Sequence, residues 1–411
     1  MLRQHSINSL WILLTRIITQ GLSIVFIAIV ARNLGSGVFG QFTVLASIVY
    51  LGNIFSTYGT DALLIRDIAR EGTVTPLVSA VLWVQIGLSI LWCLVAFLVG
   101  VQVTESIHLR MALLLFNLSL FPQAMFSVVS SILRGMERLE LYLGLNLANA
   151  LLQVFGALFF IRSSGDLLIL CLWLTVTQMA TAALGWLLCK AYIPTFSLKI
   201  RLILRDVLGV FMSAWRLALF RPVGLLNQRL NLFMLSVFMG DTATGWFSAA
   251  ARIVEGLKLG HFALLNGLMP EMSRTETVQR QRVLRSSLFG LLLWSFVPMI
   301  FIVAYADPVI RIIYGQAFGP AVQIIRIVVW SLIPYTFSSY LSMTLSMRGA
   351  EAVVLNANLI CLMAAIPIYL YLITVYGLPG VAWGTIAVEM LLAVLLLVNR
   401  RSLNLWIPNV N

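Results

Sequence analysis

Twelve apolar runs, each long enough to cross a lipid bilayer, occupy most of this 411-residue chain. A transmembrane helix needs about 20 consecutive, mainly apolar residues. The runs cover residues 10–30, 38–58, 76–99, 109–131, 141–161, 167–189, 210–239, 244–269, 287–306, 322–345, 353–375 and 378–399. The longest polar connection extends only from Lys190 to Arg205. The chain therefore has no room for a water-soluble catalytic or nucleotide-binding domain.

Composition supports the same interpretation. Hydrophobic residues make up 61% of the chain and charged residues 10%, whereas a soluble domain carries about 25% charged residues. This excludes a soluble enzyme, a disulfide scaffold and a disordered chain. Because the apolar runs are long and do not alternate with polar residues, they predict helices, not a membrane barrel. We expect an all-α polytopic membrane protein with 12 transmembrane helices.

The distribution of basic residues predicts the orientation in the membrane. With the N-terminus inside, the outer connections hold only Arg32, Arg110, Arg162 and Arg311. Seven of the 27 lysines and arginines lie inside apolar runs, and the remaining 16 lie in inner connections. Such an excess marks the cytoplasmic side, so both termini are predicted to be cytoplasmic. The net charge of +12 then follows from topology and from contact with anionic membrane lipid, and no nucleic acid partner is expected.

Two short segments repeat in corresponding connections. LGSGVFGQF (Leu34 to Phe42) follows the first run, and MGDTATGWF (Met239 to Phe247) follows the seventh. Arg134-Gly135 after the fourth run matches Arg348-Gly349 after the tenth. The repeat predicts two six-helix halves that run the same way through the membrane. We expect an N-terminal lobe at 1–190, a cytoplasmic linker at 191–206 and a C-terminal lobe at 207–411.

Three motifs carry a family resemblance. They are ARNLGSGVFGQF (Ala31 to Phe42), GWFSAAARIVEGL (Gly245 to Leu257) and IIYGQAFGPAVQIIRI (Ile312 to Ile327). In this order they resemble the polysaccharide flippases of the multidrug/oligosaccharidyl-lipid/polysaccharide (MOP) exporter superfamily, most closely the Wzx-type O-antigen flippases. The resemblance implies two pseudo-symmetric lobes around a V-shaped central cleft, lined by the first, second, seventh and eighth helices.

The resemblance also implies a function. Such proteins carry undecaprenyl-pyrophosphate-linked oligosaccharide, an O-antigen or a related surface polysaccharide unit, from the cytoplasmic to the outer leaflet by alternating access. It implies the bacterial cytoplasmic (inner) membrane, and a polymerase and a chain-length regulator as partners. A transporter of this kind is not an enzyme and needs no cofactor, although coupling to protons or sodium ions is compatible with it.

Basic residues at membrane depth are the candidate binding residues, because an ionisable side chain there costs about 2.5–3.5 kcal/mol or more unless it finds water or a partner. Arg326 lies close to an outer helix end and is expected to reach the interface. The six predicted to contact substrate are Arg16, Arg216, Arg221, Arg229, Arg252 and Lys258. Guanidinium groups match phosphate oxygens, so a cationic cleft suits a pyrophosphate.

Depth estimates at about 1.5 Å per residue bring Arg229, Arg252 and Glu255 together near the middle of the membrane. One interpretation is phosphate binding by the arginines, with Glu255 as their partner when the cleft is empty. The other is a structural salt bridge between one arginine and Glu255. A single carboxylate cannot neutralise six cations, so the salt bridge alone does not explain the whole set.

Three further residues are candidates for gating or coupling. Pro222 is predicted to bend the seventh helix beside Arg221, which would assist alternating access. Glu389 lies in the middle of the last run and Asp61 at an inner helix end. We expect no basic neighbour for Glu389, so its roles are a protonated, hydrogen-bonded structural group or an ion-coupling site.

Two alternative functions stay open. A MATE-like drug or cation exporter of the same superfamily would need an acidic or neutral cavity. A membrane polysaccharide polymerase, which is an enzyme, would need a large outer loop or a clustered acid site. Neither pattern is present, and the chain has no metal-ligand, nucleophile-elbow or phosphate-loop motif.

Overall fold

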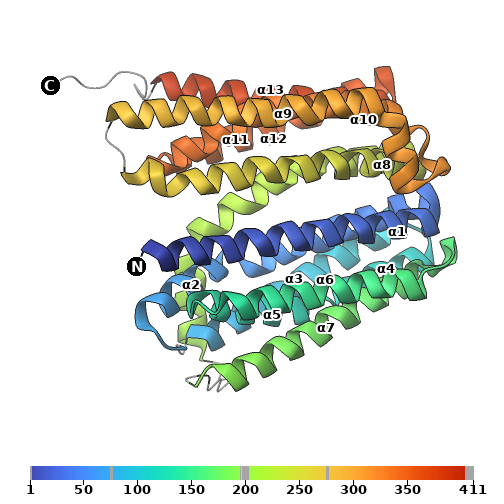
Figure 1. Ribbon diagram of the computed structural model, residues 1–411. Coiled ribbons are helices and arrows are strands. Elements are labelled where there is room, and N and C mark those ends of the chain that lie inside the picture. Colours follow the sequence, from blue (N-terminus) through green and yellow to red (C-terminus); the bar gives the residue numbers. More distant parts are fainter. Residues whose placement is uncertain (1, 75–76, 195, 197–202, 275–276, 403–411) are drawn as a thin grey trace. The chain divides into compact units, whose positions relative to one another are not determined.

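The computed structural model describes residues 2–74, 77–194, 196, 203–274 and 277–402, and every regular element in these residues is helical (Figure 1). The first elements are α1 (Leu2–Thr57), α2 (Thr60–Glu71), α3 (Leu77–Val103), α4 (Ile107–Asn117), α5 (Leu120–Gly135), α6 (Leu139–Phe160), η1 (Ser164–Asp166) and α7 (Leu167–Tyr192). The later elements are α8 (Leu204–Arg274), α9 (Thr277–Tyr314), η2 (Gln316–Phe318), α10 (Ala321–Val328), η3 (Val329–Ser331), α11 (Leu332–Met347), α12 (Glu351–Tyr376) and α13 (Leu378–Ser402).

The twelve predicted spans coincide with these helices, apart from a few residues at their ends and at breaks between helices. In the described residues, nine helical segments are long and apolar enough to cross a membrane. One of the nine, Trp11–Thr57, covers the first two predicted spans to within one residue at each end, and α8 contains the seventh and eighth. Large apolar side chains stay exposed on many of these helices, among them Leu94, Leu158 and Met363. Lipid is the solvent that such faces require, so the chain is a multi-pass membrane protein.

Two glycines let α1 and α8 turn back on themselves. Gly35 has φ 73° and ψ 169°, and Gly240 has φ 80° and ψ −176°. This region of dihedral space is essentially restricted to glycine. In Figure 1, α1 runs away from the N-terminus and returns to the same end before α2 begins. The matched glycines of the repeated segments therefore adopt the same backbone conformation and make the same reversal.

A second shared feature supports the two-fold repeat. The fourth predicted span is broken between α4 and α5, and the tenth is broken by η3 between α10 and α11. The matched pairs Arg134-Gly135 and Arg348-Gly349, which follow these spans, do not share one backbone conformation. Gly349 has φ +73°, whereas in the first half Glu137 takes the positive φ (57°). Gly135 instead packs against α2, where an added Cβ would lie 2.8 Å from Ile68 Cβ.

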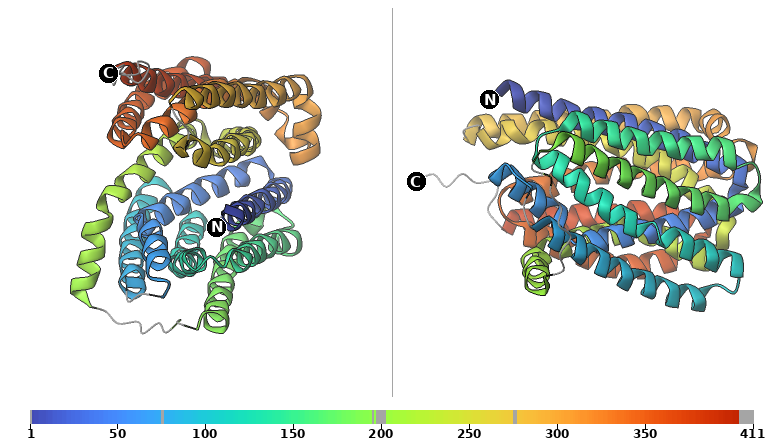
Figure 2. Two further views of the ribbon diagram at one scale, coloured as in Figure 1. Left: turned by 60° about the vertical axis from the view of Figure 1, so that its left-hand side comes forward. Right: turned by 90° about the horizontal axis from the view of Figure 1, so that it is seen from below.

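The chain divides into two compact units, which we call unit 1 (Met1–Leu225) and unit 2 (Leu226–Asn411). Within each unit the long helices run alongside one another (Figure 2). The division falls inside α8 because the start of α8 packs on unit 1. Val210 is buried in the unit 1 core, and the Phe211 ring stacks on Tyr58 with centroids 4.6 Å apart. The six-helix lobe boundaries stay a prediction from the repeat.

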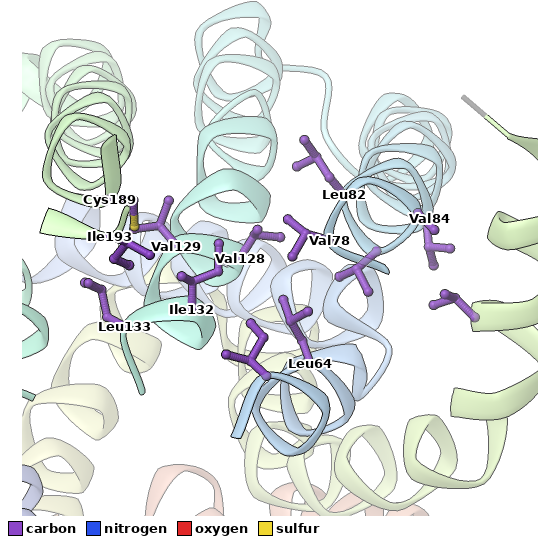
Figure 3. Close-up of a cluster of buried hydrophobic side chains, with 14 of the residues drawn as sticks. Leu64, Val78, Leu82, Val84, Val128, Val129, Ile132, Leu133, Cys189 and Ile193 are labelled. Carbon is purple, nitrogen blue, oxygen red and sulfur yellow. The ribbon is translucent and has the colours of Figure 1, made fainter. Parts of the chain in front are cut away.

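The unit 1 core lies where α2, α3, α5 and α7 meet. Leu64, Val78, Val128, Ile132 and Cys189 are buried there (Figure 3). Each is small or branched, which lets the helices approach closely.

In unit 2, close packing of α13 on α12 fixes the position of the only acidic residue on α13, Glu389. Gly380 and Gly384 form a small-xxx-small pair. A Cβ at Gly384 would lie 2.6 Å from the Tyr369 ring, and one at Gly380 would collide with the Leu372 backbone. Such pairs let membrane helices touch along their backbones.

Candidate functional site: a charged cluster in unit 2

Four of the charged residues that unit 2 contributes to α8 form a cluster. Arg229 precedes the reversal at Gly240, and Arg252, Glu255 and Lys258 follow it at intervals of three residues. Residues three apart lie on neighbouring parts of one helix surface. Because the two legs of α8 run back along each other, Arg229 is brought to that surface from the opposite leg.

Glu255 joins the two arginines. Arg229 Nη1 lies 3.0 Å from Glu255 Oε1, and Arg252 Nη1 lies 3.2 Å from Glu255 Oε2. Arg229 is the more buried arginine, with 15% of its side chain exposed, against 29% for Arg252. Each carboxylate oxygen thus accepts from a different guanidinium. A guanidinium has five N–H donors, so such a group can bind more than one acidic partner.

A second ion pair lies one helical turn further along α8. Lys258 Nζ lies 2.9 Å from Glu389 Oε1, and the two side chains are 19% and 15% exposed. Ser338 Oγ donates to Glu389 Oε2 at 3.3 Å. The Lys258 ammonium also lies 4.2 Å from the centre of the Tyr335 ring, a cation–π distance. Helices α8, α11 and α13 each contribute to this pair.

The expectation that Glu389 has no basic neighbour is therefore wrong. Lys258 and Glu389 are 131 residues apart in the chain, and helix adjacency in space cannot be read from apolar runs. Lys258 is correspondingly not an uncompensated cation. The five charges of the cluster, Arg229, Arg252, Lys258, Glu255 and Glu389, sum to +1.

A buried, hydrogen-bonded group of polar side chains adjoins Tyr335, and the sequence analysis did not single it out. His261 Nε2 lies 2.8 Å from both Ser295 Oγ and Thr336 Oγ1, and the two hydroxyls are 2.7 Å apart. The His261 ring meets Tyr335 edge-on at 5.4 Å. The available signal was that His261 follows Lys258 by three residues on the same helix. Buried polar groups that satisfy one another hold helices in one arrangement, here α8, α9 and α11.

The other predicted residues lie in unit 1. Arg16 is exposed on the first leg of α1. Arg216 and Arg221 lie in α8, but their side chains are outside the part that the structure describes. Pro222 is half-buried in a stretch that stays helical. Asp61 lies in the first turn of α2, where a carboxylate is favourable to the helix dipole.

Parts of the sequence motifs lie where helices end or reverse. Asn33 Nδ2 donates to Ile161 O at 2.6 Å in unit 1, and Trp246 Nε1 donates to Ala317 O at 3.0 Å in unit 2. Arg326 is exposed on α10. Among the described residues, no group of three or more His, Cys, Asp or Glu side chains is arranged to hold a metal ion.

Comparison with known proteins gives one family and one fold. The family model described as "Polysaccharide biosynthesis protein" matches residues 7–276. No curated protein sequence matches the chain. The lipid II flippase MurJ in an inward closed conformation is similar with a TM-score of 0.75 at 13% identity, over 94% of this chain and 87% of MurJ.

Two transporters extend the comparison. An inward-facing multidrug resistance MATE family transporter of the MOP superfamily gives a TM-score of 0.71 at 16% identity, over 94% of this chain and 95% of that chain. A MOP superfamily transporter from Pyrococcus furiosus, reported with a binding pocket of reverse polarity, gives 0.65 at 15% identity, over 97% and 95% of the two chains. The chain therefore has the fold of MOP superfamily transporters and flippases.

Proposed function

The chain belongs to the family of polysaccharide biosynthesis proteins, and we propose that it is a flippase for undecaprenyl-pyrophosphate-linked oligosaccharide. The carrier lipid moves from the cytoplasmic to the outer leaflet of the bacterial inner membrane by alternating access. The oligosaccharide is an O-antigen or related repeat unit, which a polymerase and a chain-length regulator take up on the outer side.

One observation carries this proposal: Arg229 and Arg252 converge on a single carboxylate in unit 2. A pyrophosphate must replace its hydration shell while crossing hydrocarbon, and guanidinium groups supply planar, paired donors for phosphate oxygens. Glu255 occupies the same donors when no lipid is bound. The carboxylate keeps two like charges in place without substrate and is displaced by the more highly charged pyrophosphate.

The Lys258–Glu389 pair is proposed to act beside this site. Lys258 lies one turn from Glu255 on α8, so any motion of this leg shifts both. Exchange of Lys258 between Glu389 and a bound phosphate would link substrate binding to the packing of α11 and α13. Proton or sodium coupling through Glu389 or Asp61 is part of the proposal, as are the substrate contacts of Arg16, Arg216 and Arg221.

A drug or cation exporter is the second candidate, and the largely buried carboxylate of Glu389 together with the MATE fold favours it. Glu389 already has an ammonium partner, however, and the cluster is cationic in sum. A cationic drug would have to displace Lys258 and then lie beside two arginines. The sign of the charge supports the anionic substrate.

Deletion of the gene tests the function. We expect surface polysaccharide to stop while lipid-linked repeat units accumulate on the cytoplasmic side, and a plasmid copy should restore both. Polymer that still forms at the surface would contradict the proposed function. Unchanged polysaccharide together with increased sensitivity to cationic drugs would favour the exporter.

A further inference from the structure

A cavity of about 130 Å³ lies between the first leg of α1 and α6, entirely within unit 1. Its polar lining consists of Thr19 and Ser23 from α1 and Asn146, Asn149 and Gln153 from α6. None of these five side chains is ionisable in the physiological range. The cavity is therefore neutral and polar, unlike the charged cluster of unit 2.

The lining follows helical periodicity on both sides. On α6 it recurs at residues 146, 149, 150 and 153, and on α1 at residues 19, 22, 23 and 26. This i, i+3, i+4, i+7 spacing places each set along one face of its helix. In most membrane helices such a face would be apolar, yet α6 carries three carboxamides here in a span of mean hydropathy 1.6.

The cavity lies at membrane depth. The hydrogen bond from Asn33 of α1 to Ile161, just after α6, shows that these parts of the two helices lie at the same level. Depth along both helices can therefore be measured from this level. At about 1.5 Å per residue, Phe26 and Thr19 lie roughly 14 and 24 Å below Gly35, and Gln153 and Asn146 roughly 12 and 22 Å below Ile161. The two polar faces therefore match in depth along most of their length.

Hydrogen bonding between α1 and α6 does not explain why these side chains are polar. Asn146 Nδ2 donates to Tyr142 O at 2.8 Å, Gln153 Nε2 donates to Asn149 Oδ1 at 3.3 Å, and Thr19 Oγ1 donates to Thr15 O at 2.7 Å. All three bonds stay within one helix. They do not use the carboxamide oxygens of Asn146 and Gln153 or the amide nitrogen of Asn149. The five polar lining side chains are half-buried.

We propose that this cavity binds a sugar ring of the lipid-linked oligosaccharide, an inference that rests on the proposed function. Carboxamides and hydroxyls offer paired donors and acceptors, which are the groups that neutral sugar hydroxyls require. A phosphate would lack a cation among the five polar groups, and an apolar tail would leave the amides unsatisfied. Phe26 is one of the lining residues and supplies an apolar surface for the ring carbons.

The test distinguishes binding of the sugar from binding of the pyrophosphate. Binding is measured to purified protein in lipid nanodiscs with two probes: undecaprenyl pyrophosphate alone, and undecaprenyl pyrophosphate bearing the repeat unit extracted from the source cell. We expect wild-type protein to bind the glycosylated carrier more tightly. Asn149→Leu should reduce that preference about tenfold, the effect of losing two neutral hydrogen bonds, and leave the affinity for the sugar-free carrier unchanged.

Two further variants complete the test. Ala150→Leu fills the cavity without removing any amide and should also abolish the preference. Leu151→Ala is the matched control, because Leu151 is the next residue on α6, is exposed and does not line the cavity. This variant should prefer the glycosylated carrier as strongly as wild type does. Binding of the sugar-free carrier reports that each variant is folded.

The outcomes distinguish the two proposals. Wild-type protein that binds both carriers equally well, or cavity variants that keep the full preference, would overturn the sugar site while the pyrophosphate site stands. Wild-type protein that binds neither carrier would overturn the proposed function and the sugar site with it.

Discussion

Glu255 accepts from Arg229 and Arg252 at 3.0 and 3.2 Å, and this contact has two physical explanations. In the first, the carboxylate substitutes for a phosphate. In the second, it holds the two legs of α8 together. Removal of a single partner cannot separate them, since both explanations predict damage when a charge is left uncompensated.

Substitution of Arg229 is expected to stop transport without unfolding the protein. Arg229→Ala removes the most buried donor of the cluster and should abolish flipping, with normal insertion in the membrane. Arg229→Lys should recover only part of the activity, because a point charge loses the bidentate geometry. Flipping rates and membrane levels of the two variants check this. Full activity in Arg229→Lys would contradict bidentate binding.

The double variant Arg229→Ala/Glu255→Ala distinguishes the two explanations directly. If the pair is only structural, removal of both charges leaves nothing uncompensated and activity should return close to wild type. The phosphate explanation predicts that the double variant stays inactive. Measured recovery would exclude Arg229 as a phosphate ligand and leave Arg252 as the remaining candidate.

The Lys258–Glu389 pair makes a separate prediction about stability. Lys258→Met should lower the free energy of unfolding by about 3–5 kcal/mol, the cost of leaving one buried charge without its partner. Lys258→Met/Glu389→Leu should recover most of that loss. Thermal unfolding in detergent measures both. A single variant as stable as wild type would show that the pair is already hydrated in the protein.

The residues of this cluster could be predicted from the sequence, but not all of their contacts could. Arg229, Arg252 and Glu255 were predicted together because they lie at similar depths on two legs joined by one reversal. The contact between Lys258 and Glu389 joins α8 to α13, and no periodicity within either helix encodes it. The same holds for the contacts of His261, since Ser295 and Thr336 come from α9 and α11.

At the scale of elements, hydropathy predicts where helices lie but not how they are joined. Predicted spans coincide with helices throughout the described residues because length and apolarity determine membrane insertion. The two breaks marked by Gly35 and Gly240 were expected to be loops. Each is instead one glycine inside an otherwise helical chain, which is why α1 and α8 each contain two spans.

These reversals give a prediction with an internal control. Gly35→Ala and Gly240→Ala should each destabilise the protein by about 1–3 kcal/mol, because alanine does not tolerate this backbone conformation. An added Cβ would meet no described atom within 4 Å at either position, so packing does not contribute. Gly21→Ala in α1 and Gly290→Ala in α9 have equally open surroundings and should be neutral or slightly stabilising. Equal effects at all four glycines would contradict this.

At the scale of the whole molecule, the family and the fold are established while the direction of insertion is a prediction. The excess of basic residues in the connections predicted as inner places both termini in the cytoplasm. Reporter fusions after Lys199 should give a cytoplasmic signal, and fusions after Arg162 an external one. An external signal after Lys199 would reverse the orientation and contradict the assignment of the inner leaflet as the loading side.

The central claim is that this protein moves a pyrophosphate-linked oligosaccharide across a bilayer, and transport by the purified protein tests it most directly. Proteoliposomes are loaded with a fluorescent lipid-linked oligosaccharide, and the fraction accessible to an outside reagent is followed over time. We predict that wild-type protein accelerates transfer between leaflets over protein-free liposomes and that Arg229→Ala does not. Transfer no faster than in protein-free liposomes, or equal rates in wild type and Arg229→Ala, would contradict the account.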